Sequence, residues 1–259
     1  MKSLIKKISN TKVFVFLRNT LNFKPVYTLL PKRNYPVCIS DSFIWRTDNG
    51  FVTKFKYTDI INLFYKSKNS WVEFYFYSKE NKLLKKKIIS DLNLSNELLI
   101  SPEYLDNLKD YGVFHIYHFS EDFKSIGEKD IISNTCYIGF SKDNCLYSFI
   151  HGNVEANYRS IDSSNKKISS DIIKTSCFKT QEYTIQKYFD GFDKNELVLT
   201  NPTSNKIKFS IENDDYILKP NCTIILEVKN AIVSIRSNCM LFRPIIFSYK
   251  DEYLDVHHG

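Results

Sequence analysis

Histidine, the side chain best suited to proton transfer near neutral pH, occurs at five positions in three short stretches. The stretches are Phe114–His118, Ile150–Glu155 and Asp255–Gly259. A glycine directly follows His151 and His258, and this pairing places an imidazole beside a backbone that another group can approach closely. Such sites are typical of binding or catalysis. We therefore take His151, His257 and His258 as candidate acid–base groups.

An imidazole that transfers protons needs a partner to orient it. Glu155 and Asp255 lie in the same stretches and could serve; we include Glu155 among the candidate catalytic residues. Alternatively, His151, Glu155 and either His257 or His258 could supply three zinc ligands. Their spacing is not diagnostic, so we predict no metal site and name no cofactor. A further alternative is that the chain ends in a solvated tail.

His115 and His118 are interpreted differently from the other histidines. They are three residues apart in an aromatic stretch that reads as a strand, so they face opposite sides of it. They cannot bind one metal ion unless the strand is bulged. We expect one or both to fill a core position through a backbone hydrogen bond.

Arginine is rare in this lysine-rich chain, and its planar fork suits carboxylate or phosphate ligands better than an ammonium group does. A cleft in which arginines hold an anion, an amide orients it and an aromatic ring stacks on it is one interpretation. The candidate ligand-binding residues are Arg236, Arg243, Asn153, Arg46, Trp45 and Arg159. The alternative is structural: Arg46 pairs with Asp48 or Asp41, and the others tie strand ends.

The amino-terminal segment is basic. Eight lysines and arginines precede Asp41, the first acid, and together they exceed the net charge of +7, so the rest of the chain is close to neutral. Apolar residues share one helical face here with flanking lysines, a pattern that predicts binding to an anionic membrane surface. The membrane candidates are Lys2, Lys6, Lys7 and Lys12. Alternatively, this helix packs on its own domain.

The elements that must position these residues are mainly strands. Alternating segments such as Trp71–Tyr77 and Lys206–Ile211, separated by frequent turn residues, predict an antiparallel β-sandwich or jelly-roll-like fold of one or two packed units behind a basic N-terminal helical arm. A short helix should follow Asp59, and Cys136–Ser141 should form a hairpin with Leu146–His151.

Four segments follow from this pattern. They are a basic arm and linker (1–36), a β-rich unit (37–157), a polar, serine-rich loop or junction (158–176) and a C-terminal β-sandwich portion (177–259). Whether the last segment belongs to one domain with 37–157 stays open. No C-x-x-C pair occurs among the six cysteines, so we expect buried free thiols in a reducing cytoplasm. No apolar run approaches the ~20 residues of a membrane span.

Three functions fit these features. The first is a cytoplasmic, membrane-surface protein that binds or modifies a polar, anionic glycan or sugar phosphate. The second is a non-catalytic β-sandwich module that recruits a partner enzyme. The third is a nucleic-acid-binding accessory protein acting through the arm, which has the least support because the remaining chain is close to neutral. Neither the substrate nor the oligomeric state follows from the sequence.

Overall fold

The computed structural model describes residues 11, 13–14, 17, 35–122, 126–133, 136–161, 170–176, 180–185, 191–229, 232–239 and 241–259. The prediction of a mainly β protein is confirmed, with 57% strand and 6% helix. The predicted helical arm lies almost entirely outside the described residues, and so do Lys2, Lys6, Lys7 and Lys12. Within the described residues, no helix has the length and apolar character that crossing a bilayer requires.

Two four-stranded sheets from the amino-terminal half face each other across an aromatic core. One contains β2 (Phe43–Arg46), β7 (Tyr111–Ser120), β4 (Ser70–Ser78) and β5 (Leu83–Ile89). The other contains β10 (Ser148–His151), β9 (Tyr137–Lys142), β3 (Phe51–Thr58) and β6 (Ser95–Ile100). The Phe55 ring lies 4.7 Å from that of Phe43 and 4.9 Å from that of Phe114, both edge-on, which is the favoured geometry for aromatic pairs.

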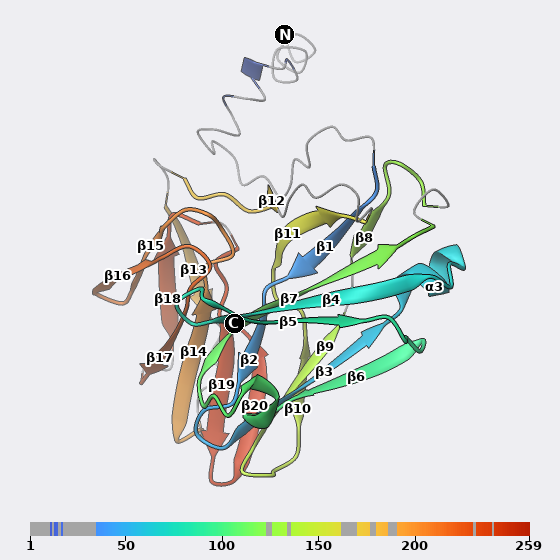
Figure 1. Cartoon of the computed structure of the whole chain (residues 1–259). Coiled ribbons are helices and arrows are strands. Elements are labelled where there is room, and N and C mark those ends of the chain that lie inside the picture. Colours follow the sequence, from blue (N-terminus) through green and yellow to red (C-terminus); the bar gives the residue numbers. More distant parts are fainter. Residues whose placement is uncertain are drawn as a thin grey trace.

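Two further sheets come from the carboxyl-terminal half and appear at the left of Figure 1. The first contains β17 (Thr223–Val228), β14 (Lys194–Thr200), β19 (Ile245–Lys250) and β20 (Tyr253–His258). The second contains β13 (Gln181–Ile185), β18 (Val233–Ser237), β15 (Ile207–Ile211) and β16 (Asp214–Leu218). A second apolar core fills the space between these sheets.

The β17-β14-β19-β20 sheet is buried on both faces. Leu197 and Ile246 face the second core, whereas Val198, Ile245 and Phe247 face the aromatic core of the amino-terminal half. Burial on both faces explains why β14 and β19 have continuous apolar runs instead of alternation. This middle sheet therefore joins the two halves.

A fifth sheet contains β12 (Ser170–Asp171), β11 (Glu155–Ser160), β1 (Val37–Asp41) and β8 (Ile131–Ser133). Strand β1 pairs antiparallel with β11 but parallel with β8, so the fold is not purely antiparallel. At the two ends of the segment predicted as a polar loop or junction (158–176), residues 158–160 complete β11, and β12 pairs with that strand. The serine-rich composition concealed a strand whose pairing partners are distant in sequence.

Local signals were more dependable. Helix α3 (Ile60–Tyr65) begins after Asp59, whose carboxylate accepts a hydrogen bond from the Asn62 amide at 3.1 Å, as an N-cap does. A single 3-10 turn, η1 (Glu103–Leu105), follows β6. The predicted hairpin is present as β9 and β10. The cysteines among the described residues are free thiols, and all of these except Cys145 are buried.

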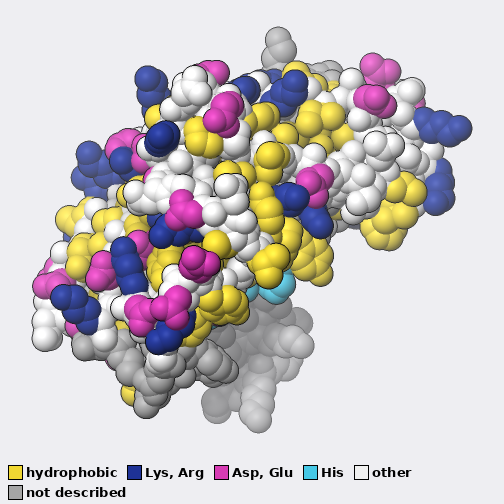
Figure 2. All heavy atoms as spheres, turned by 90° about the horizontal axis from the view of Figure 1, so that it is seen from below, with side chains coloured by type: hydrophobic (Ala, Val, Ile, Leu, Met, Phe, Trp, Pro, Cys, Tyr) yellow, Lys and Arg dark blue, Asp and Glu magenta, His cyan; other side chains and the backbone are white. Residues whose placement is uncertain are grey.

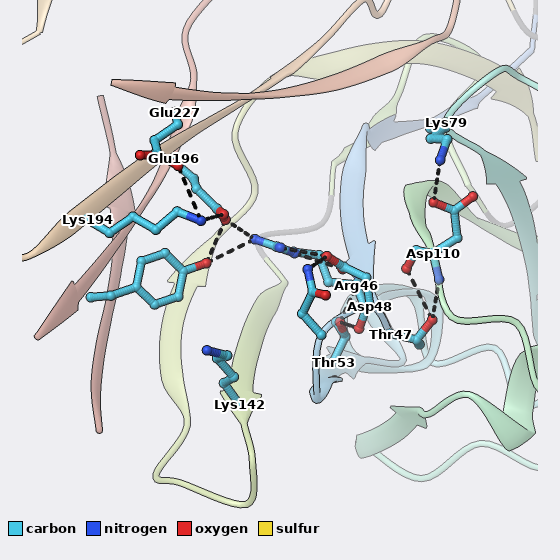
Figure 3. Close-up of polar contacts among 12 residues, drawn as sticks. Arg46, Thr47, Asp48, Thr53, Lys79, Asp110, Lys142, Lys194, Glu196 and Glu227 are labelled. Atoms are coloured by element: carbon cyan, nitrogen blue, oxygen red, sulfur yellow. Dashed lines mark hydrogen bonds and ion pairs between the residues drawn. The ribbon is translucent and has the colours of Figure 1, made fainter. Parts of the chain in front are cut away.

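Arg46 links the two halves through a buried network, shown in Figure 3. Its guanidinium contacts the carboxylates of Asp48 and Glu196, each at 2.7 Å, and lies 4.0 Å from the centre of the Phe51 ring. The preceding Trp45 is wholly buried, and its Nε1 donates to the Tyr77 carbonyl at 2.9 Å. Trp45 and Arg46, both predicted to bind a ligand, are therefore buried inside the protein. Arg46 pairs with Asp48, which was the structural alternative to ligand binding.

The Arg46–Glu196 pair should contribute strongly to the free energy of unfolding. Burial alone would raise the pKa of Glu196, but Arg46, Tyr249 and Lys194 outweigh it and lower that pKa to about 2. The stabilisation is therefore present above the unfolded value of about 4.3 and is lost as pH falls towards 2. We expect Glu196→Gln to lower the free energy of unfolding by about 3 kcal/mol at pH 7, because the Arg46 charge stays buried.

Urea denaturation at pH 7 and pH 3 measures this effect, which should be smaller at the lower pH. Glu227→Gln is the matched control, since Glu227 is half exposed and reaches Lys194 at 3.5 Å; its effect should stay below about 1 kcal/mol. Equal losses in the two variants would contradict a special role for the buried pair.

Candidate functional site

His151 and His258 lie side by side. They end β10 and β20, two strands that meet where the Val256 amide donates to the Ser148 hydroxyl at 2.9 Å. The centres of the two imidazole rings are 4.7 Å apart. Figure 2 shows histidine side chains reaching the surface beside hydrophobic ones. Two of the histidine stretches are therefore brought together, although more than a hundred positions separate them in the chain.

Arg243 lies next to these histidines and is held by Asn153. Its Nε donates to Asn153 Oδ1 at 2.9 Å, and its Nη2 donates to the Asn153 carbonyl at 3.1 Å. In return, Asn153 Nδ2 donates to the Arg243 carbonyl at 2.9 Å. This reciprocal pairing fixes the plane of the guanidinium. Among the described residues, no hydrogen bond reaches its Nη1 nitrogen, so that end of the fork is available to a ligand.

Asp41 completes the cluster and was not predicted. Its carboxylate lies against the backbone of Gly152, where an added Cβ would stand only 1.5 Å from Oδ2. Burial, and then the charge of Glu155, raise the pKa of Asp41 to about 7, although Arg243 acts in the opposite direction. The close approach expected at Gly152 is thus confirmed, and the approaching group is a carboxylate that is partly protonated at neutral pH.

His258 is shifted in the other sense. Burial, and then the positive field of Arg243 and the neighbouring imidazoles, lower its pKa to about 4. It is therefore neutral at pH 7, and both of its ring nitrogens are buried without a hydrogen-bond partner of ordinary geometry among the described residues. Arg243 acts electrostatically on both Asp41 and His258. A partly protonated carboxyl and a neutral imidazole in one cluster make a potential acid–base pair.

The remaining predicted catalytic residues have identifiable partners. His257 Nδ1 lies 3.0 Å from Asp255 Oδ2, the orienting contact expected for it. Glu155 accepts a hydrogen bond from the Ser133 hydroxyl at 2.8 Å and acts on Asp41 through its charge. Across the described part of the chain, no three histidine, cysteine or acidic side chains are arranged to hold a metal ion.

A pocket of about 420 Å³ adjoins the cluster, and Asn153 and Arg243 form one of its walls. Strands β13 and β18 also line it, through Glu182, Tyr183 and Ile235. Its chemistry is mixed, with one carboxylate and one guanidinium among apolar and aromatic side chains. A polar ligand with a hydrophobic face fits such a lining.

The other predicted residues do not line this pocket. Arg236 is exposed on β18 and donates to the Thr180 hydroxyl at 3.1 Å. Arg159 stacks on tyrosines of β4 and β7. His115 and His118 are buried, and His115 Nδ1 lies 3.1 Å from the Asp41 carbonyl, as the core interpretation expected.

Asp41 could not be identified from sequence because its position depends on strand register. It is opposite Glu155 only because β1 and β11 shift register between Ser40 and Asp41. Irregularities of this kind redirect a side chain without a local sequence signal. The glycine after His151 was the available clue, since it marks a close approach without identifying the approaching group.

Comparison with known proteins adds no identification. No protein-family model matches the chain, and no curated protein or solved structure matches it significantly.

The pKa of Asp41 has a testable sign. Its value is about 7 when folded, against about 3.9 when unfolded, so the folded state retains the proton longer and this group's contribution to stability falls as pH rises between these values. We expect Asp41→Asn to be stabilised relative to the parent protein at pH 8 and not at pH 4. Denaturation at both values, with exposed Asp193→Asn as the control, measures the difference. A pH-independent difference would contradict the raised pKa.

Proposed function

We propose that the protein binds a polar, anionic ligand of the glycan or sugar-phosphate class at the cluster of Asp41, His151, Asn153, Arg243 and His258. The observation that carries the proposal is the position of Arg243. It is held by Asn153, acts on both Asp41 and His258, and lines the adjoining pocket. An arginine fixed in this way offers its remaining donors to an anion, with little loss of side-chain entropy on binding.

Aromatic residues beside the histidines favour a sugar. Tyr137 pairs with His151 in the β9–β10 register and is 53% exposed. Phe149 lies flat across Gly139, where an added Cβ would be 2.5 Å from its ring. These rings offer apolar faces on which the C–H face of a sugar can stack, next to groups that hydrogen-bond its hydroxyls. The layered sheets of the proposed β-sandwich supply a rigid base for such a platform.

The acid–base pair favours modification of the ligand over binding alone. Asp41 is able to donate a proton at neutral pH, and His258 is able to accept one. In the alternative of a non-catalytic module, the same groups bind the ligand and no turnover occurs. Association with an anionic membrane surface in the cytoplasm remains part of the proposal, supported by the basic composition of 1–36.

The test is a ligand panel of sugar 1-phosphates, uronic acids and sulfated oligosaccharides, measured by calorimetry with product analysis. We expect Arg243→Lys to weaken binding about tenfold or more, because lysine cannot keep both contacts with Asn153 while contacting an anion. Arg236→Lys is the matched control and should bind normally. His151→Ala removes an exposed imidazole and should weaken binding without loss of stability.

Unchanged affinity in both Arg243→Lys and His151→Ala would refute the proposed site. Binding without turnover in the parent protein would assign the module function. Loss of turnover in Asp41→Asn with binding retained would assign the enzymatic one.

A further inference from the structure

Arg159 lies on β11, and tyrosine rings from a different sheet hold its guanidinium. The guanidinium carbon is 4.2 Å from the centre of the Tyr75 ring and 4.7 Å from that of Tyr117. These rings belong to β4 and β7, on the face of their sheet that turns away from the aromatic core. Two stacked contacts fix the plane of the fork without using its N–H donors.

No acceptor satisfies this fork. The Nε of Arg159 is buried without a hydrogen-bond partner, and among the described residues no hydrogen bond or ion pair reaches the guanidinium. The contrast with Arg46, which contacts two carboxylates, and with Arg243, which is paired with Asn153, is clear. A buried donor in this state is costly unless a ligand supplies the acceptor.

Among the described residues, no acidic side chain is paired with Arg159. The Glu73 carboxylate lies next to Tyr75, but it already pairs with the Lys86 ammonium at 2.9 Å and accepts a hydrogen bond from the Tyr75 hydroxyl. Lys86 itself lies 5.2 Å from the centre of the Tyr75 ring. His115, which faces Tyr77 and Tyr117, is buried, and Arg159 helps to keep it neutral. Glu73 is therefore paired with Lys86, and no carboxylate among the described residues forms an ion pair with Arg159.

We propose that Arg159 is an oxyanion-binding residue, whose guanidinium donates hydrogen bonds to two oxygens of a phosphate or carboxylate group while Tyr75 and Tyr117 fix its orientation. The site is separate from the histidine cluster: Glu155 and Arg159 are four residues apart on β11, about 13 Å at 3.3 Å per residue. The inference goes beyond the proposed function and does not depend on it.

The test uses inorganic phosphate and acetate, each titrated against chloride at matched ionic strength. Two readouts are followed: calorimetric affinity, and the NMR signals of the Arg159 Nε–H and the Tyr75 ring. We expect saturable binding in the parent protein, with the affinity reduced about tenfold in Arg159→Lys, which keeps the charge and loses the fork. Preference for phosphate over acetate, or the reverse, then assigns the oxyanion class.

Arg236→Lys is the matched control and should leave this binding unchanged. In Arg243→Lys, the shifts of the Arg159 Nε–H and Tyr75 signals should persist, which would show that the histidine cluster is not their source. Equal weakening in Arg236→Lys would show surface attraction and overturn the proposal. Should Arg159→Lys fail to fold, the shift of the Arg159 Nε–H signal in the parent protein on titration with each anion still tests whether Arg159 binds it. Absence of any saturable shift with either anion overturns the inference.

Discussion

Burial of the Arg46 charge between the two halves of the chain constrains the rest of the structure. The guanidinium is 1% exposed, and removing it from water would cost several kcal/mol without its carboxylates. Asp48 provides one from the neighbouring loop, but Glu196 comes from β14, in the other half of the chain. The halves must therefore dock in one register, and the rings of Phe51 and Phe247 complete the environment of the same cation.

The parts of the fold that sequence could predict are those governed by local chemistry. The Asp59 cap, the β9–β10 turn and the alternation of β4 depend on residues within a few positions of each other, and each is present. The parallel pairing of β1 with β8 and the extent of β11 depend on distant partners. The apolar run of β14 is equally ambiguous, because only the packing of a sheet on each face explains it.

The candidate site divides along the same line. Histidine, glycine and arginine types directed attention to His151, His258 and Arg243, which the fold does bring together. Asp41 was not predicted because a register shift sets the direction of its side chain. Trp45 is buried, and an aromatic residue beside an arginine has the same sequence pattern whether it stacks on a ligand or fills a core. The rarity of arginine indicated positions where the guanidinium makes specific contacts. It did not indicate whether the partner is a carboxylate of the protein or a ligand.

The doubly buried middle sheet has a consequence for how this protein loses its structure. Unfolding either half would expose one apolar face of β14 and β19 to water. The free energy of unfolding of one half therefore depends on the other half staying folded. The molecule should then behave as a single cooperative unit despite its five sheets. Because β20 is hydrogen-bonded to β19 and carries His258, unfolding of the middle sheet would also take the histidine cluster apart.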